Sequence, residues 1–124
     1  MSILVLLSLG FSFIGYAYLS HNIDMINHFR HFLTTGVYGL VFFMVLVIVS
    51  TIHTGRHIVT NFWTHLSILL IITSTFIRVL IPYYEQYTTQ AYMLSSILWA
   101  IPFIIYMKIF FPYLLEKRAD GLPG

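Results

Sequence analysis

The sequence predicts an all-α integral membrane protein, a small bundle of four transmembrane helices, and three observations support this prediction. Of its 124 residues, 59% are hydrophobic and only 8% are charged, whereas soluble domains carry about 25% charged residues. The mean hydropathy is +0.88. Four apolar runs, each close to the ~20 residues that cross a bilayer, fill almost the whole chain. We therefore expect a single transmembrane domain over residues 1–124.

The first run covers about residues 3–19. A signal peptide is the alternative, but the start has no Lys or Arg and no A-x-A cleavage site follows, so a retained helix is favoured. Ser8, Ser12 and Gly15 place small side chains on one face of this helix. Such a face would let a neighbouring helix approach closely. The alternative is that a lipid-facing helix tolerates these small residues.

The second run covers about residues 32–52 and follows a polar loop that we expect at residues 20–31. Gly36 and Gly39 lie about one turn apart, which predicts a notch for a neighbouring helix. Gly55 follows the last apolar residues, as is typical where a helix stops.

The third run covers about residues 62–81. On a helical wheel Ser67, Ser74 and Arg78 fall within about 20° of one another. An Arg that faces lipid one turn inside the hydrocarbon is costly. This polar stripe should therefore face protein.

The fourth run covers about residues 90–111 and leads into a polar tail at 114–124. Pro102 predicts a kink. Bulky and polar side chains recur at spacings of three and four along one face, which suits helix packing or, alternatively, the wall of a porphyrin pocket. The members of this face are Tyr92, Ser96, Trp99, Phe103, Tyr106 and Phe110.

The positive charges predict an orientation. With four crossings, Arg56, Lys117 and Arg118 lie on one side of the membrane and Arg30 lies on the other. Basic residues favour the cytoplasmic side, so we expect both termini in the cytoplasm. The scattered basic residues give no support to a nucleic-acid partner. No Asp or Glu lies inside a span, which disfavours a proton transporter.

The six histidines gather at the two ends of the second helix. A neutral imidazole ligates haem iron, and a nearby Arg neutralises the haem propionates. We therefore predict haem b at both ends, with His31, His53 and His65 as the metal ligands. The full set is His21, His28 and His31 with Arg78 at one end, and His53, His57 and His65 with Arg56 at the other.

The predicted ligands cannot share one iron. His31 and His53 are 22 residues apart, roughly 33 Å along a helix, although the wheel places both on the same side, about 40° apart. His53 and His65 would ligate one haem, whereas His31 needs His28, His21 or another chain. The alternative is that these histidines are interfacial polar residues without a cofactor.

Other chemistry has little support in the sequence. With no cysteine, thiolate metal sites and iron–sulfur clusters are excluded. The chain has no HExxH motif and no Ser/His/Asp set. We therefore expect no self-contained catalytic site.

Four segments resemble motifs of the NnrS family, in the same order. Residues 31–36 (HFLTTG) and 53–56 (HTGR) are similar to the family's HxLTxG…HTGR pattern. Residues 78–82 (RVLIP) are similar to its LRVLxP segment, and residues 118–124 (RADGLPG) to its RxDGxPG ending. NnrS proteins have many more crossings, so the resemblance covers their C-terminal part only.

The resemblance implies a bacterial inner-membrane protein that binds haem and copper and is tied to nitric oxide stress. The residues that it transfers are His31, His53, Arg56 and Arg78. Met1 favours a complete small protein, whose sites a partner chain or self-association would complete. It would act in the nitric oxide response or in respiratory electron transfer. The alternative is a cofactor-free accessory subunit of a larger respiratory complex, such as a terminal oxidase or nitric oxide reductase.

Overall fold

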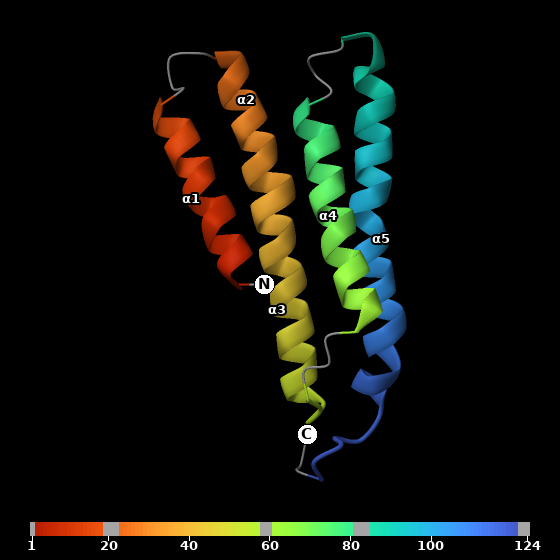
Figure 1. Cartoon of the computed structure of the whole chain (residues 1–124). Helices are drawn as coiled ribbons and strands as arrows, with labels where there is room; N and C mark the ends of the chain where they lie inside the picture. Colours follow the sequence, from red (N-terminus) through yellow and green to blue (C-terminus); the bar gives the residue numbers. More distant parts are fainter. Residues whose placement is uncertain (1, 19–22, 58–60, 81–84, 122–124) are drawn as a thin grey trace.

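A computed structural model describes residues 2–18, 23–57, 61–80 and 85–121, and every regular element among them is helical. Neighbouring helices run antiparallel and form an elongated bundle (Figure 1). The predicted all-α class is therefore confirmed. The elements are α1 (Ser2–Tyr18), α2 (Ile23–His31), η1 (Phe32–Val37), α3 (Tyr38–His53), α4 (Phe62–Leu80), η3 (Glu85–Tyr87) and α5 (Thr88–Leu115).

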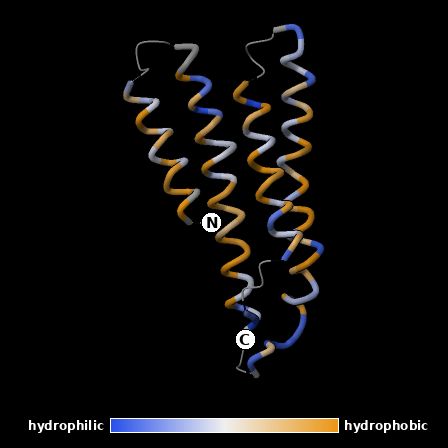
Figure 2. Tube along the Cα trace, viewed as in Figure 1, coloured by the Kyte–Doolittle hydropathy of each residue, from blue (hydrophilic) through white to orange (hydrophobic). Residues whose placement is uncertain are grey.

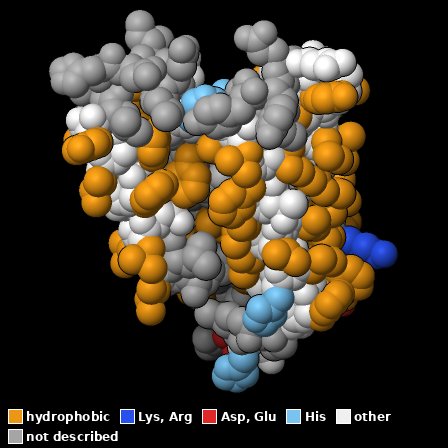
Figure 3. Space-filling view, turned by 45° about the horizontal axis from the view of Figure 1, so that its top comes forward, with side chains coloured by type: hydrophobic (Ala, Val, Ile, Leu, Met, Phe, Trp, Pro, Cys, Tyr) orange, Lys and Arg blue, Asp and Glu red, His pale blue; other side chains and the backbone are white. Residues whose placement is uncertain are grey.

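Three helices are long and apolar enough to cross a membrane: Ile26–His53, Phe62–Leu80 and Thr88–Leu115. Apolar residues run along the helices (Figure 2), and hydrophobic side chains are prominent on the face of the bundle seen in Figure 3. Helix α1 has 17 residues, about 26 Å in length, and is shorter than the other spans. The helices support a membrane protein, while the count of four crossings and the cytoplasmic termini stay predictions.

The loop predicted at residues 20–31 is wrong for Ile23–His31, which forms helix α2. Phe29 packs onto α1, where its ring lies 5.7 Å from that of Phe11. A Cβ on Gly15 would come within 2.1 Å of the Phe29 ring, so the glycine admits this ring. This packing stabilises a helix in a polar stretch, and it confirms the predicted contact face of α1.

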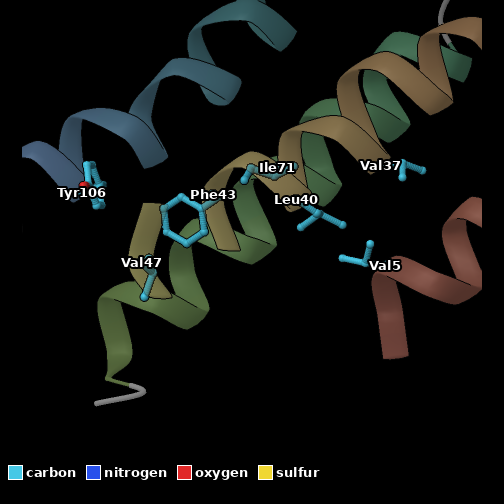
Figure 4. Packing of buried hydrophobic residues seen from close by; sticks show 7 residues of the cluster. All are labelled: Val5, Val37, Leu40, Phe43, Val47, Ile71 and Tyr106. Carbon is cyan, nitrogen blue, oxygen red and sulfur yellow. The ribbon is translucent and has the colours of Figure 1, made fainter. Parts of the chain in front are cut away.

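The core lies where the helices cross in the middle of the bundle (Figure 4). Its members come from α1, η1, α3, α4 and α5, so one cluster joins both halves of the chain. The buried hydrophobic residues of this cluster are Val5, Val37, Leu40, Phe43, Val47, Ile71 and Tyr106.

Helices α4 and α5 are joined by a reciprocal pair of serines. Ser74 Oγ donates to the Ser95 carbonyl oxygen at 2.8 Å, and Ser95 Oγ donates to the Ser74 carbonyl oxygen at 3.0 Å. Ser67 and Ser74 are fully buried and Arg78 is half-buried. The polar stripe therefore faces protein, as predicted.

Candidate functional site

A π-helical turn interrupts the long second span. Within η1 (Phe32–Val37), the chain widens to i→i−5 bonding, and the Tyr38 N–H donates to the Leu33 carbonyl. Turns of this kind recur at functional sites. The HFLTTG motif thus begins at His31, the last residue of α2, and continues into the π turn.

The glycines of this segment let α4 and α5 approach closely. A Cβ on Gly36 would lie 2.8 Å from Thr75 Cγ2, and one on Gly39 would lie 2.6 Å from Trp99 Nε1. The predicted notch is confirmed. The Trp99 indole N–H donates to the Thr35 carbonyl oxygen at 3.1 Å, so α5 supplies a donor to a carbonyl inside the π turn.

A cavity of about 270 Å³, which we call the His31 cavity, opens beside the π turn. Its one formal cation, Arg78, lies over the Tyr92 ring at 5.2 Å and reaches Ser96 Oγ at 3.5 Å. The His31 ring is 5.8 Å from the same Tyr92 ring. The lining residues are His31, Thr34, Thr35, Arg78, Ser96 and Trp99.

The HTGR motif forms the end of α3 at the opposite end of the bundle. Gly55 has a positive φ of 64°, which favours glycine. The Gly55 N–H donates to the Ile52 carbonyl and the Arg56 N–H donates to the Thr51 carbonyl, each at 3.1 Å. These bonds satisfy carbonyls at the helix end, and the predicted helix stop is confirmed.

The C-terminal motif packs against this helix end. The Ala119 N–H donates to the Thr54 carbonyl at 3.0 Å. Arg118 donates to both carboxylate oxygens of Asp120, at 2.9 and 2.6 Å, and this hydrogen bond raises the pKa of the Arg118 guanidinium. A Cβ on Gly55 would meet the Asp120 carboxyl group. Two motifs about 60 residues apart therefore meet at one place.

The Arg56 guanidinium contacts two side chains, and one of its terminal nitrogens has no hydrogen-bond partner among the described residues. Its Nη2 donates to Glu116 at 2.7 Å, and the guanidinium carbon lies 4.0 Å from the centre of the Tyr113 ring. The other terminal nitrogen, Nη1, is buried and has no hydrogen-bond partner among the described residues. A buried donor of this kind favours an anionic acceptor.

A larger cavity, about 660 Å³, lies beside Arg56, and we call it the His57 cavity. It falls in the size range of ligand pockets, about 300–1,000 Å³. Helices α3, α4 and α5, the turn after α3 and the tail all contribute to it. The lining residues are Val47, Thr51, Gly55, Arg56, His57, Asn61, Thr64, Ile109, Phe110, Tyr113, Ala119 and Asp120.

The predicted site residues fall into three groups. His31 and Arg78 line one cavity, and Arg56 and His57 line the other. His53 and His65 are exposed and line neither cavity, and the His65 ring bonds the Asn61 carbonyl through Nδ1 at 2.9 Å. Of the other two candidates, His28 is half-buried on α2 and also lines neither cavity, and His21 lies outside the residues that the structure describes.

The π turn also changes the angular positions of the residues around the axis of the long span, Ile26–His53. The wheel that placed His31 and His53 on one side assumed a regular α-helix, and a π turn holds more residues per turn. His31 lines a cavity whereas His53 is exposed. Within the described parts of the chain, no group of three His, Asp or Glu residues is placed to hold a metal ion.

No sequence pattern predicted a role at this site for Tyr113, Glu116 or Asp120. Only the RADGLPG motif signalled that the tail matters. We predicted only a polar tail at residues 114–124, whereas the structure places Ala119 and Asp120 in the wall of the His57 cavity. Phe110, on the predicted aromatic face, also lines it, while Trp99 lines the His31 cavity.

The fold, with the His31 and His57 cavities, defines an all-helical membrane protein with Arg and His side chains at both ends of its bundle. The chain belongs to the NnrS family, because the family model described as NnrS protein matches residues 1–118. Comparisons with curated proteins and with solved structures give no match. Family membership supports a membrane protein related to the nitric oxide response.

Proposed function

We propose that this chain is a haem-binding protein of the bacterial inner membrane that acts in the nitric oxide response and holds haem b in the His57 cavity. The observation that carries the proposal is the buried, unpartnered Nη1 of Arg56 beside a cavity that His57 also lines. Haem propionates are carboxylates, and a guanidinium nitrogen without a protein acceptor suits them.

The residues of the His57 cavity suit haem b in the type of ligand that they offer, and the cavity suits it in volume. Among the described lining residues, His57 is the one imidazole, the ligand type that haem iron takes from histidine. Phe110 and Tyr113 supply aromatic walls, which suit a flat apolar ring. The volume of about 660 Å³ lies within the range of ligand pockets.

Each residue has a separate task in the proposed site. Arg56 orients the ligand by its carboxylate, and Glu116 and Tyr113 hold Arg56 in place. The tail residues Ala119 and Asp120 form part of the cavity wall and limit access of water. Bound haem would supply reversible binding of a small gas or transfer of one electron.

The cavity offers His57 alone as an imidazole, so any second protein ligand for the haem would have to come from outside it, because His53 and His65 do not line it. The proposal therefore includes a partner chain or a second copy of this chain. Copper is left out of the proposal, since the described residues offer no three-ligand group for a metal ion.

A haem spectrum of the protein purified in detergent tests the proposal. We expect a Soret band, an α band in the reduced-minus-oxidised spectrum, and a positive pyridine haemochrome. His57→Ala should lose most of the haem. His65→Ala is the matched control, because His57 and His65 are both exposed and only His57 lines the cavity.

Two results would overturn the proposal. If His65→Ala loses haem and His57→Ala keeps it, the ligands are those of the predicted His53–His65 pair and the cavity is not the site. If the parent protein has no Soret band but co-purifies with a large respiratory complex, the cofactor-free accessory subunit is the better description.

A further inference from the structure

The His31 cavity is too small for the group predicted there. Its volume of about 270 Å³ falls below the range of pockets that enclose drug-sized ligands, and a porphyrin is larger than most of those ligands. Its lining carries two donors that can serve a ligand, the Arg78 guanidinium and the His31 imidazole, while the Ser96 hydroxyl donates to the Tyr92 carbonyl at 2.7 Å. This set suits a small oxyanion rather than a macrocycle.

The charge of Arg78 needs an anion. Among the described side chains the ion pairs are Arg56–Glu116 and Arg118–Asp120, and neither involves Arg78. Its contacts are the face of Tyr92 and a long bond to Ser96 Oγ, which orient the guanidinium without neutralising it. A cation near the end of a membrane-spanning helix attracts the phosphate groups of lipids.

An open apolar groove adjoins the cavity along α5. It is lined by Thr89, Tyr92, Met93, Ser96 and Ile97, so Ser96 belongs to both the cavity and the groove. Met93 and Ile97 are 63% and 58% exposed. A polar cavity that continues into an apolar groove matches a lipid, whose charged head joins an acyl chain.

The cavity also lies at a suitable depth. Helix α5 has 28 residues, about 42 Å, which exceeds a hydrocarbon core of about 30 Å. The excess of about 12 Å is enough for the ends of α5 to extend into the headgroup regions. Arg78 is two residues from the end of α4, and Ser96 is in the third turn of α5, so both lie near the boundary between headgroups and hydrocarbon.

We infer that the His31 cavity binds the phosphate of an anionic phospholipid, with Arg78 as the main contact and an acyl chain along the Met93–Ile97 groove. The His31 imidazole adds a hydrogen bond to a phosphate oxygen, and Ser96 helps to position Arg78. This inference uses the end of the bundle away from the His57 cavity. It therefore holds or fails independently of the proposed haem.

Trp99 lines the cavity and serves as the reporter. Trp63→Phe leaves it as the one tryptophan, and the protein is reconstituted with phospholipids whose acyl chains are brominated, which quench tryptophan on contact. Each intensity is divided by that in unbrominated lipid of the same headgroup. We expect phosphatidylglycerol to be bound about fivefold more tightly than phosphatidylcholine, the effect of one basic residue near an anionic lipid.

Variants of Arg78 separate charge from folding. Arg78→Gln should lose the preference for phosphatidylglycerol, whereas Arg78→Lys should keep most of it, because Lys binds phosphate as a point charge. Lys108→Gln is the matched control, since it removes an exposed cation on the same helix as the groove, and it should keep the preference.

Three results would overturn the inference. The first is equal quenching by the two brominated lipids in the parent. The second is a preference that survives Arg78→Gln or disappears in Lys108→Gln. The third is loss of the preference when excess inorganic phosphate is added, because the cavity would then take free phosphate and not a lipid.

Discussion

The carboxyl group of Asp120 occupies the space that a side chain on Gly55 would need, since a Cβ there would lie 2.5 Å from Asp120 Cγ. Gly55 is therefore required twice, for its positive φ of 64° and for its missing side chain. This contact joins the end of α3 to the C-terminal tail and forms part of the wall of the His57 cavity.

Gly55→Ala should lower the free energy of unfolding and release the tail. A non-glycine residue at positive φ costs of order 1–3 kcal/mol, and the new methyl group must also displace Asp120. We expect faster tryptic cleavage after Lys117 and Arg118 in the folded protein, followed by mass spectrometry.

Two other glycines serve as controls for that prediction. Gly121→Ala shares the positive φ, 75°, but its Cβ would meet nothing within 4 Å, and Gly10→Ala in α1 also meets nothing. Gly121→Ala should show only the backbone effect, and Gly10→Ala should be neutral or slightly stabilising. If all three variants are cleaved at the parent rate, the contact between Gly55 and Asp120 does not hold the tail.

Trp99→Phe should destabilise the π turn. The variant keeps an aromatic ring but removes the N–H that bonds the Thr35 carbonyl, and Thr35 is only 8% exposed. Losing this hydrogen bond between α5 and the π turn should cost about 0.5–1.5 kcal/mol. The measurement is the free energy of unfolding in mixed micelles, followed by circular dichroism.

Trp63→Phe is the matched substitution at an exposed tryptophan. Trp63 is 50% exposed and packs against Phe62, so its loss should change the free energy of unfolding by less than about 0.5 kcal/mol. Equal effects of the two Trp→Phe variants would argue against a specific role of the Trp99 indole N–H.

The helices were predictable because hydrophobic runs and small residues act locally. The bounds of the third span, 62–81, differ by one residue from Phe62–Leu80. Gly36 and Gly39 could be predicted to form a notch because a missing side chain lets any neighbouring helix approach closely. The fully buried Ser67 and Ser74 followed from angular spacing alone.

The rest depended on partners distant in the sequence. Trp99 donates a hydrogen bond to Thr35 in the π turn from 64 residues away along the chain. No local sequence pattern predicts this turn. The tail looks like a polar terminus until Ala119 bonds Thr54. The prediction paired His53 with His65 because a short hairpin joins them, whereas the cavity forms between helices and is lined by His57 instead.

Ser74→Ala and Ser95→Ala should each destabilise the bundle and should not be additive. Each side chain bonds the other residue's backbone carbonyl across the α4–α5 interface, and the two Oγ atoms also bond each other at 3.1 Å, which couples the two substitutions. Hydrogen bonds between membrane helices average about 0.6 kcal/mol and reach about 1.7. A double-mutant cycle on the free energy of unfolding should give a coupling in this range.

Ser67→Ala provides the contrast. Ser67 is also fully buried, but its Oγ has no hydrogen-bond partner among the described residues. Removing an unsatisfied buried hydroxyl should be neutral or stabilising. A loss of stability as large as that of Ser74→Ala would mean that Ser67 has a partner, such as a buried water, that the protein atoms do not supply.

Arg56→Lys should weaken haem retention although it keeps the positive charge. Lys can pair with Glu116, but it has no second nitrogen in the position of Nη1 and does not stack on Tyr113 as a planar fork. Losing one charge-assisted hydrogen bond, about 1.5–3 kcal/mol, lowers haem affinity roughly ten- to hundred-fold. The measurement is the rate of haem transfer to an excess of a high-affinity haem acceptor.

Glu116→Gln is the control for this prediction. The side chains of Arg56 and Glu116 are 28% and 58% exposed, so their ion pair is worth at most about 1 kcal/mol. If Arg56→Lys releases haem at the parent rate, Nη1 does not contact the propionate.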